Sequence, residues 1–349
     1  MGLFASGAGA SLIRNEAALD FEFVPKILPF RESEQRRIVQ AIKPLLAGRT
    51  GRNVCVFGAP GIGKTAAAKH VLRDLEEETD EVHVAYVNCW QHNTSFKIYV
   101  DICEQLGFQF THNKNTQELF KVIERIVNKK AGVFVFDEVD KAEDFDFLYT
   151  LLEGIYKKTL VLITNYKEWV VNVDDRIRSR LMPEMVEFRK YNVNETRDIL
   201  RQRVGYAFAE GVFTDEALGK VAAKAFELGD IRTGLFLLRE AAMQAEEAGA
   251  SKVLPEHVLA AQAKLDEFTA KSKEVLEEES KAILELVQKN SGLRIGDLFK
   301  KYQEEGGKAS YKTFQRRIAM LGENHYVSVK KQKGAGGNTT IVERKLTEY

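Results

Sequence analysis

The sequence predicts an α/β fold in three parts: a parallel sheet covered by helices over residues 1–190, a helical domain over 191–268, and a linker with a C-terminal domain over 269–349. Three observations lead to this prediction. Short apolar runs alternate with helical patterns as far as Tyr191, only helical periodicity follows, and the residues from about 275 onward combine helices with a hairpin pattern. At 349 residues, the chain also exceeds the size that one hydrophobic core usually reaches.

The apolar runs are the expected strands of the sheet. Strands that alternate with helices favour parallel pairing, because each helix carries the chain back across the sheet. The expected strands are 53–57, 82–87, 133–136, 159–163 and 185–188. The next helices are expected in NETRDILRQRVGYAFAEG, TDEALGKVAAKAFELG and DIRTGLFLLREAAMQAEEAG, and a fourth begins at Pro255. A charged stretch around 269–280 predicts a solvated helical linker, followed by helices near 275–289 and 294–305.

The segment FGAPGIGKT lies between the first expected strand and a helix. Its glycines, lysine and threonine have the spacing of a phosphate-binding loop, in which backbone N–H groups surround an anion. In such a loop the lysine reaches the β- and γ-phosphates, the threonine hydroxyl binds Mg²⁺, and the start of the helix faces the phosphates. We therefore expect a nucleoside triphosphate to bind here with Mg²⁺. The residues expected to bind it are Gly58, Ala59, Pro60, Gly61, Ile62, Gly63, Lys64, Thr65 and Ala66.

Polar residues follow two later strands, at the edge where open α/β sheets bind ligands. VFVFDEVD contains Asp137, which suits magnesium, and Glu138, which suits polarising a water for attack on the γ-phosphate. TLVLITN ends at Asn165, whose amide would orient that water or the γ-phosphate; the alternative is a turn asparagine. We expect these residues and Lys64 to be catalytic, with Thr65 and Asp137 as metal ligands.

Two arginines in VDDRIRSRLM are candidates for a role in a neighbouring subunit. If Asp174 or Asp175 caps a short helix, Arg176 and Arg180 lie four residues apart on one of its flanks. A rigid guanidinium on such a helix is the form that an arginine finger takes. We assign Arg180 to the catalytic set and leave open whether it or Arg176 is the finger.

A third arginine lies in LGDIRTGLFLLREA. Asp230 is a good N-cap, which places Arg232 in the first turn, where the helix dipole disfavours a cation. A nearby anion reverses that penalty. We therefore expect Arg232 to contact the γ-phosphate and to couple the position of the helical domain to ATP or ADP.

Composition argues against a membrane-spanning protein, an exported protein and a histidine-based metal site. The longest apolar runs are too short to cross a bilayer, and the N-terminus lacks a basic segment followed by a long apolar one. The three cysteines are widely spaced in apolar patterns, which indicates reduced core thiols, and the six histidines lack metal-ligand spacing. We expect a cytoplasmic, nucleoid-associated protein.

The C-terminal region carries a concentrated positive charge. The 51 basic and 51 acidic residues balance over the whole chain, but from Lys308 onward nine Lys or Arg stand against three Glu, a net charge of +6. In the predicted helix Ser310–Leu321, the apolar face holds Tyr311, Phe314, Ile318 and Leu321. The outward residues are Lys312, Thr313, Gln315, Arg316 and Arg317, and the hairpin after this helix carries Lys330, Lys331 and Lys333.

A basic third helix followed by a lysine-bearing hairpin is the layout of a winged helix that binds DNA. We expect most of these residues to contact phosphates, and Thr313, Gln315 and Arg316 to reach base edges. The alternative is a domain that docks on protein and whose charges keep it soluble.

Together, GAPGIGKT, FVFDEVD, LITN, DDRIRSRL and GDIRTGLFLLREA, followed by a winged helix, resemble the archaeal origin-recognition and cell-division-control family of replication initiators, within the AAA+ ATPases. The resemblance runs from VPKILPFRESE onward and implies an AAA+ base, a helical lid and a winged helix. It places LPFRESE near the adenine, and Tyr191 and Arg203 against the nucleotide. VNCWQHNTSFKIYVDICEQLG resembles the initiator-specific insertion, which touches DNA in the family.

The resemblance implies a weak ATPase that uses ATP, ADP and Mg²⁺, binds double-stranded origin DNA and recruits the replicative helicase, with other initiator subunits as further partners. Slow hydrolysis would act as a switch. Two alternatives stay open: an ATPase similar to clamp loaders or transposition helpers, and a DNA-binding scaffold in which nucleotide is structural.

Overall fold

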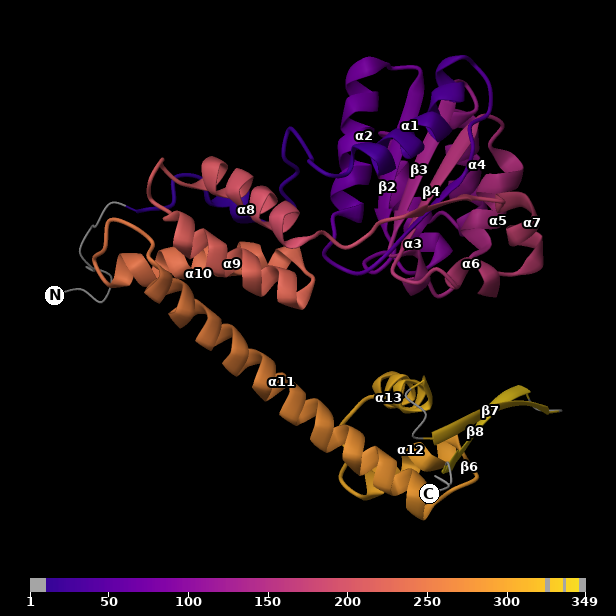
Figure 1. Ribbon diagram of the computed structural model, residues 1–349. Coiled ribbons are helices and arrows are strands. Elements are labelled where there is room, and N and C mark those ends of the chain that lie inside the picture. Colours follow the sequence, from indigo (N-terminus) through magenta and orange to yellow (C-terminus); the bar gives the residue numbers. More distant parts are fainter. Residues whose placement is uncertain (1–10, 324–326, 335–336, 345–349) are drawn as a thin grey trace. The chain divides into compact units, whose positions relative to one another are not determined.

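The computed structural model describes residues 11–323, 327–334 and 337–344. The chain divides into two compact units, Met1–Ala261 and Gln262–Tyr349. The first unit holds a sheet with its helices and a following group of helices, and the second holds a smaller fold of helices and a hairpin (Figure 1).

A five-stranded sheet forms the base of the first unit. In spatial order its strands are β2 (Val82–Asn88), β3 (Ala131–Asp137), β4 (Lys158–Thr164), β1 (Val54–Phe57) and β5 (Glu184–Glu187). Every neighbouring pair is parallel, so the predicted strands and their pairing are confirmed, with strand ends shifted by at most two residues. Because the strands are parallel, the segments that follow β1, β3 and β4 meet at one edge of the sheet.

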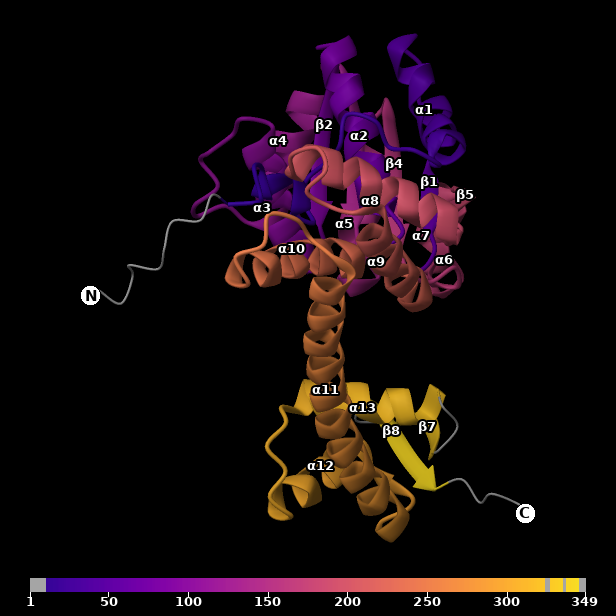
Figure 2. The ribbon, with the colours of Figure 1, turned by 60° about the vertical axis from the view of Figure 1, so that its left-hand side comes forward.

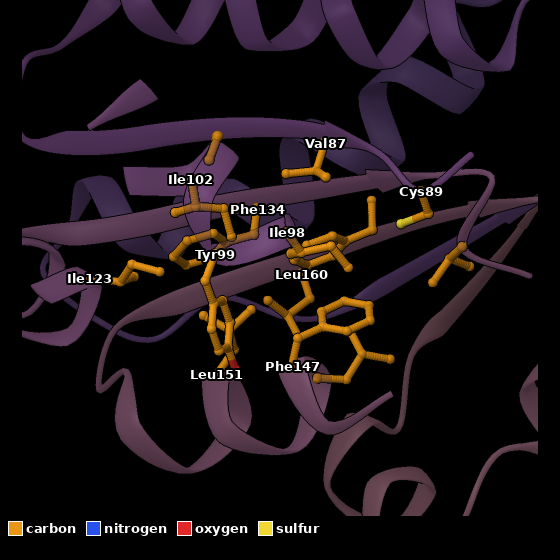
Figure 3. Packing of buried hydrophobic residues seen from close by; sticks show 14 of the residues in the cluster. Val87, Cys89, Ile98, Tyr99, Ile102, Ile123, Phe134, Phe147, Leu151 and Leu160 are labelled. Carbon is orange, nitrogen blue, oxygen red and sulfur yellow. The ribbon is translucent and has the colours of Figure 1, made fainter. Parts of the chain in front are cut away.

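Helices cover both faces of the sheet. In its central strands, the residues that point to one face and the residues that point to the other are both apolar, so each face needs a covering layer. On β3, Val133 and Val135 face α1 (Glu32–Leu46) and α2 (Lys64–Glu78). Phe134 and Phe136 face the opposite cluster, which Figure 3 shows in close-up. This second face is covered by α3 (Ser95–Gln105), α4 (Thr116–Val127), α5 (Asp146–Gly154), α6 (Trp169–Asn172) and α7 (Asp175–Leu181).

Three helices follow the sheet and pack together: α8 (Val193–Ala207), α9 (Asp215–Leu228) and α10 (Ile231–Glu247) (Figures 1 and 2). We call this group, with the first turns of α11 (Pro255–Lys289), the lid. Each helix of the group begins at a side-chain cap: Asn192 for α8, Thr214 for α9 and Asp230 for α10. These caps satisfy backbone N–H groups that have no partner within the helix. The predicted cap at Asp230 is confirmed.

The first turn of α8 also carries an ion pair, between Glu195 and Arg189, at the junction of the sheet and the lid. The Glu195 carboxylate accepts hydrogen bonds from Arg189 Nη1 at 2.7 Å and from the Asn192 backbone N–H at 2.9 Å. Mainly because of the bond from Arg189, the pKa of Glu195 falls from 4.5 to about 2. As the pH falls, the Glu195 carboxylate is therefore protonated in the unfolded chain before it is protonated in the folded chain. The ion pair stabilises the fold above about pH 4.5, and this stabilisation is lost as the pH falls toward 2.

We expect Glu195→Gln to lower the free energy of unfolding at pH 7 by about 1–2 kcal/mol, because the variant loses a charge-assisted bond and weakens a helix cap. Urea unfolding at pH 7 measures this loss. Melting temperatures should show the difference from the parent shrinking between pH 4.5 and 2. Glu187→Gln, at an exposed position of β5, is the matched control. A difference that stayed constant with pH would contradict the ion pair.

The second unit builds a small core from three helices and a sheet. Besides the end of α11, it contains α12 (Ile295–Glu304) and α13 (Tyr311–Glu323). Its strands β6 (Leu293–Arg294), β7 (Val327–Gly334) and β8 (Gly337–Arg344) form an antiparallel sheet in the order β6-β8-β7. Phe314, Ile318 and Leu321 lie buried in the core, as predicted for the apolar face of α13, whereas Tyr311 is 40% exposed.

The charged stretch near 269–280 is helical, as the sequence predicted. It lies within α11, which runs from Pro255 to Lys289 without interruption, so the helix expected to begin at Pro255 and the one expected near 275–289 are a single helix. The segment contains no glycine and no proline after Pro255, and its alanine, leucine, lysine and glutamate residues all favour helix. Charge alone therefore does not end a helix that contains no glycine and no internal proline.

Candidate nucleotide-binding site

The phosphate loop, residues 58–65, follows β1 and includes the first two residues of α2, and its backbone is crowded on two sides. Gly61 has φ 69°, and a Cβ there would lie 1.9 Å from Asp230 Oδ1 of the lid. Gly63 has φ 88°, and a Cβ there would lie 2.9 Å from the Tyr191 hydroxyl. Only glycine combines this left-handed backbone with such close approach. The glycines of the motif are therefore required by the packing of the loop.

Lys64 begins α2 and points back across the loop. Its buried Nζ donates to the carbonyl oxygens of Gly58 at 2.8 Å and Ala59 at 2.7 Å, and to Asn165 Oδ1 at 2.8 Å. Burial lowers the pKa of Lys64 to about 8, although the charge of Asp137 opposes the shift. A phosphate oxygen beside this ammonium would offset the cost of its burial.

The carboxylate of Asp137 is held from three directions at the end of β3. Its Oδ2 accepts from Thr65 Oγ1 at 2.6 Å and from the Tyr86 hydroxyl at 2.7 Å, and its Oδ1 accepts from the Glu138 backbone N–H at 2.9 Å. Burial, and then Asp137, raises the pKa of the Tyr86 phenol. The predicted pair of Thr65 and Asp137 is thus in direct contact, and Tyr86 is a partner that the sequence reasoning missed.

Glu138 follows in a backbone conformation that is unusual for a residue with a side chain. Its φ is 51°, in the left-handed region, where non-glycine residues store strain that often accompanies function. Burial, together with Asp137 and Asp140, raises the pKa of the Glu138 carboxyl. A carboxylate whose pKa is raised toward neutrality is a better proton acceptor.

Asn165, directly after β4, completes the polar edge of the sheet through its bond to Lys64. The residue before it, Thr164, is buried and donates from Oγ1 to Asp140 Oδ1 at 2.8 Å. Asp140 lies in the short η2 helix (Val139–Lys141) after Glu138, so this bond joins the segment that carries Glu138 to the one that carries Asn165. The sequence reasoning did not single out Asp140, although it belongs to the same acidic run.

The lid contributes Arg232 from the first turn of α10. The Arg232 backbone N–H donates to Asp230 Oδ1 at 2.8 Å, and the Ile231 N–H donates to the carbonyl of Gly61 at 3.2 Å. The start of α10 therefore contacts the phosphate loop directly. The exposed Arg232 side chain lines the cavity described below.

A buried arginine at position 31 joins three segments, and the sequence reasoning missed it. Arg31 is 0% exposed and donates to the carbonyls of Ile62 at 3.0 Å and Arg189 at 2.6 Å, and to the Tyr191 hydroxyl at 2.9 Å. Its guanidinium lies 3.9 Å from the centre of the Tyr191 ring and pairs with Glu34 at 2.8 Å. Arg31 thus holds together the N-terminal segment, the phosphate loop and the start of the lid.

Tyr191 and Arg203, implied by family resemblance to contact the nucleotide, both border the cavity. Arg203 is also buried, and its two Nη atoms donate to the carbonyls of Ala18 at 3.1 Å and Phe23 at 2.9 Å. The guanidinium of Arg203 therefore fixes the N-terminal segment that forms one wall of the cavity.

These residues surround one cavity between the sheet edge, the lid and the N-terminal segment. Twelve of the predicted site residues line it: Pro60, Gly61, Gly63, Lys64, Thr65, Ala66, Asp137, Glu138, Asn165, Tyr191, Arg203 and Arg232. The apolar remainder of its wall comes from Phe21, Pro25, Leu28, Pro29, Ile163, Ile199, Ile231 and Leu235. A wall that combines charged and polar groups with apolar ones is what a nucleotide requires. Ile62 instead points into the core beneath α2.

The chain matches two family models, the AAA domain over residues 47–204 and the Cdc6 AAA+ ATPase-type lid domain over residues 197–263. It is 34% identical to ORC1-type DNA replication protein 1 of Sulfurisphaera tokodaii over 277 residues, which cover 76% of this chain and 70% of that protein. It is 31% identical to the ORC1-type DNA replication protein of Cenarchaeum symbiosum over 321 residues, covering 85% and 78%. The chain belongs to the ORC1-type DNA replication proteins.

Solved structures agree with this membership. The ORC1 protein of Aeropyrum pernix, determined in complex with DNA, has a TM-score of 0.70 and 27% identity, and the match covers 95% of this chain and 93% of that one. Cdc6p of Pyrobaculum aerophilum has the same fold, with a TM-score of 0.65 and 19% identity over 96% and 95% of the two chains. As an ORC1-type protein, the chain is an AAA+ ATPase and an ATP-dependent initiator of DNA replication, which confirms the predicted family, the AAA+ fold with its helical lid, and the initiator function.

The ORC1-type chain offers magnesium a suitable pair of ligands. The Thr65 hydroxyl and the Asp137 carboxylate lie 2.6 Å apart at the cavity wall, and both are the oxygen ligands that Mg²⁺ prefers. Within the described residues, no group of three or more His, Cys, Asp or Glu side chains could hold a metal ion. A Mg²⁺ ion bound by Thr65 and Asp137 would complete its coordination with water and phosphate oxygens.

Arg176 and Arg180 lie away from the cavity of the ORC1-type chain, on α7, which packs on the opposite face of the sheet from α2. Asp174 caps α7, as predicted, and pairs with Arg176 at 3.2 Å. Arg180 pairs with Glu153. Both side chains are exposed.

The residues predicted to bind DNA lie on α13 and β7 of the ORC1-type chain's second unit. Lys312, Gln315 and Arg316 are exposed, whereas Thr313 and Arg317 are partly buried, which differs from the predicted outward face. Thr313 lies in the first turn, where its N–H donates to the capping Ser310 Oγ at 3.3 Å. The side chains of Lys330, Lys331 and Lys333 lie outside the described part of the chain.

Across the residues that the structure covers, no helix has the length and apolar character needed to cross a membrane.

Proposed function

We propose that this chain binds double-stranded origin DNA through its second unit and helps to recruit the replicative helicase, and that ATP in the cavity of its first unit switches this activity. The observation that supports the proposal most is the cavity itself. Lys64 and Glu138 from the sheet edge and Arg232 from the lid border the same space. A nucleotide in it contacts both parts at once, as a switch requires.

Hydrolysis follows from the residues at the sheet edge. Mg²⁺ held by Thr65 and Asp137 would neutralise charge on the β- and γ-phosphates. The Glu138 carboxylate accepts a proton from the attacking water, and the Asn165 amide orients that water or the γ-phosphate. We further propose that Arg180, with Arg176 as the alternative, serves the cavity of a neighbouring subunit.

The lid reads the nucleotide through α10. Arg232 binds the γ-phosphate, and the Ile231 N–H bond to Gly61 joins the same helix to the phosphate loop. Loss of the γ-phosphate removes a ligand of Arg232 while the loop keeps its contact. We propose that hydrolysis is slow and that ADP stays bound, since the protein then persists in either of two states.

DNA binding is assigned to the second unit as a winged helix, with α13 in the major groove and the β7–β8 hairpin along the backbone. Two features support this assignment: the exposed Lys312, Gln315 and Arg316 on one helix, and the membership of a family in which the Aeropyrum pernix ORC1 protein was determined with DNA. Lys312 contacts phosphate, while Gln315 and Arg316 reach base edges.

We expect the double variant Lys312→Ala/Arg316→Ala of the full chain to bind an origin duplex at least tenfold more weakly at 0.15 M salt. The plot of log affinity against log salt should become shallower by about 0.9 for each lost phosphate contact. Fluorescence anisotropy with labelled duplex, with ATP and with ADP, measures both quantities. Arg36→Ala/Lys43→Ala removes two exposed cations from α1 and is the matched control. Equal affinities for the two double variants would overturn the assignment.

A further inference from the structure

We propose that Tyr86 is a positioning residue for the magnesium site, in which its hydroxyl holds the Asp137 carboxylate in the orientation that faces Thr65. The proposal rests on the proposed function, because it takes the cavity to bind ATP with Mg²⁺. It adds a residue on β2, a strand that contributes none of the predicted site residues.

The register of the sheet places the phenol beside the carboxylate. Tyr86 pairs with Val135 of β3, and Asn88 pairs with Asp137, so Tyr86 and Asp137 lie two positions apart on neighbouring strands. Side chains at this diagonal point to the same face of the sheet, and a long side chain spans the gap. The Tyr86 hydroxyl reaches Asp137 Oδ2 at 2.7 Å.

The ring of Tyr86 is fixed by the helix above it. Lys69 Nζ lies 4.8 Å from the ring centre, and Lys69 also pairs with Glu22 of the N-terminal segment. Thr65 and Lys69 are four residues apart on α2 and therefore share one face of that helix. The same face of α2 thus carries Thr65, which donates to Asp137, and Lys69, whose ammonium lies over the ring of Tyr86. The Tyr86 hydroxyl is the second donor to Asp137.

Three donors leave the Asp137 carboxylate a single orientation. The Glu138 N–H occupies Oδ1, and the Thr65 and Tyr86 hydroxyls converge on Oδ2 at 2.6 and 2.7 Å. When Thr65 Oγ1 also binds a cation, Tyr86 is the side-chain donor to Asp137 that does not itself bind the cation. Partners of this kind orient metal ligands, and their loss typically weakens metal binding by about 10–100-fold.

Tyr86→Phe in the full chain tests the proposal, because it removes one hydroxyl and keeps the ring. Binding of a fluorescently labelled ATP is measured in an Mg²⁺ titration and in excess EDTA. We expect the Mg²⁺ concentration that gives half of the magnesium-dependent enhancement to rise about tenfold. Affinity in EDTA should stay within about twofold of the parent, since the phosphate loop and the apolar wall are unchanged. Tyr156→Phe, at a position that is 74% exposed, is the matched control and should match the parent in both measurements.

A purely structural role for Tyr86 gives a different result. Loss of general stability would weaken ATP binding by the same factor with Mg²⁺ and with EDTA, and would lower the melting temperature of the nucleotide-free protein in parallel. Either that pattern or an unchanged Mg²⁺ midpoint would overturn the inference. If the parent protein itself bound no ATP, the proposed function would fail first, so the two failures are distinguishable.

Discussion

Lys64→Ala is expected to weaken ATP binding at least a hundredfold. Lys64 lines the cavity, where its ammonium would contact the β- and γ-phosphates. A hydrogen bond to a charged group contributes about 1.5–3 kcal/mol, and about 2.7 kcal/mol corresponds to a factor of 100 in affinity. Isothermal titration calorimetry with ATP and Mg²⁺ measures the change directly.

Two controls make the result specific to the site. Lys43→Ala removes an exposed lysine of α1 and should bind ATP as the parent does. Circular dichroism melting of Lys64→Ala establishes that the variant is folded, because its side chain also bonds Gly58, Ala59 and Asn165. A folded Lys64→Ala with parental affinity would show that the cavity is not where the phosphates bind.

Glu138→Gln is expected to reduce the rate of ATP hydrolysis by about 10²–10³-fold while ATP binding is retained. Glutamine has the shape of glutamate but cannot accept a proton from water. The variant should therefore hold ATP and prolong the DNA-bound state. Single-turnover hydrolysis with labelled ATP gives the rate, and filter binding gives the retained nucleotide.

Glu168→Gln, at an exposed position before α6, is the matched control for the loss of one carboxylate. Hydrolysis at the parental rate in Glu138→Gln would move the role of proton acceptor to another group. Asp140 would then be the next residue to replace, because it lies two residues further on and bonds Thr164 beside Asn165.

Much of the site could be predicted because it follows from local pattern and sheet topology. The phosphate loop is a contiguous motif with its own spacing. Asp137 and Asn165 could be found because each ends a recognisable apolar strand, and parallel strands bring such ends together. The caps at Asp174 and Asp230 are likewise local, since each depends on residues within one turn.

The residues that were missed act through contacts between distant segments. Arg31 directly precedes the charged run ESEQRR, where nothing in the sequence sets it apart, and its bonds to Ile62, Arg189 and Tyr191 depend on the packing of the whole unit. Tyr86 has the alternation of an ordinary strand residue, and its bond to Asp137 depends on the register of two strands. Periodicity and composition contain neither the packing nor the register.

Arg31 also has a consequence for how a signal leaves the cavity. One guanidinium grips the phosphate loop at Ile62 and the chain at Arg189 and Tyr191, just before α8 begins. Because the Arg31 side chain is fully buried and bonded to both segments, a displacement of the loop is transmitted to the chain at Arg189 and Tyr191. The phosphate loop and the segment before α8 are therefore expected to move together, because Arg31 connects them.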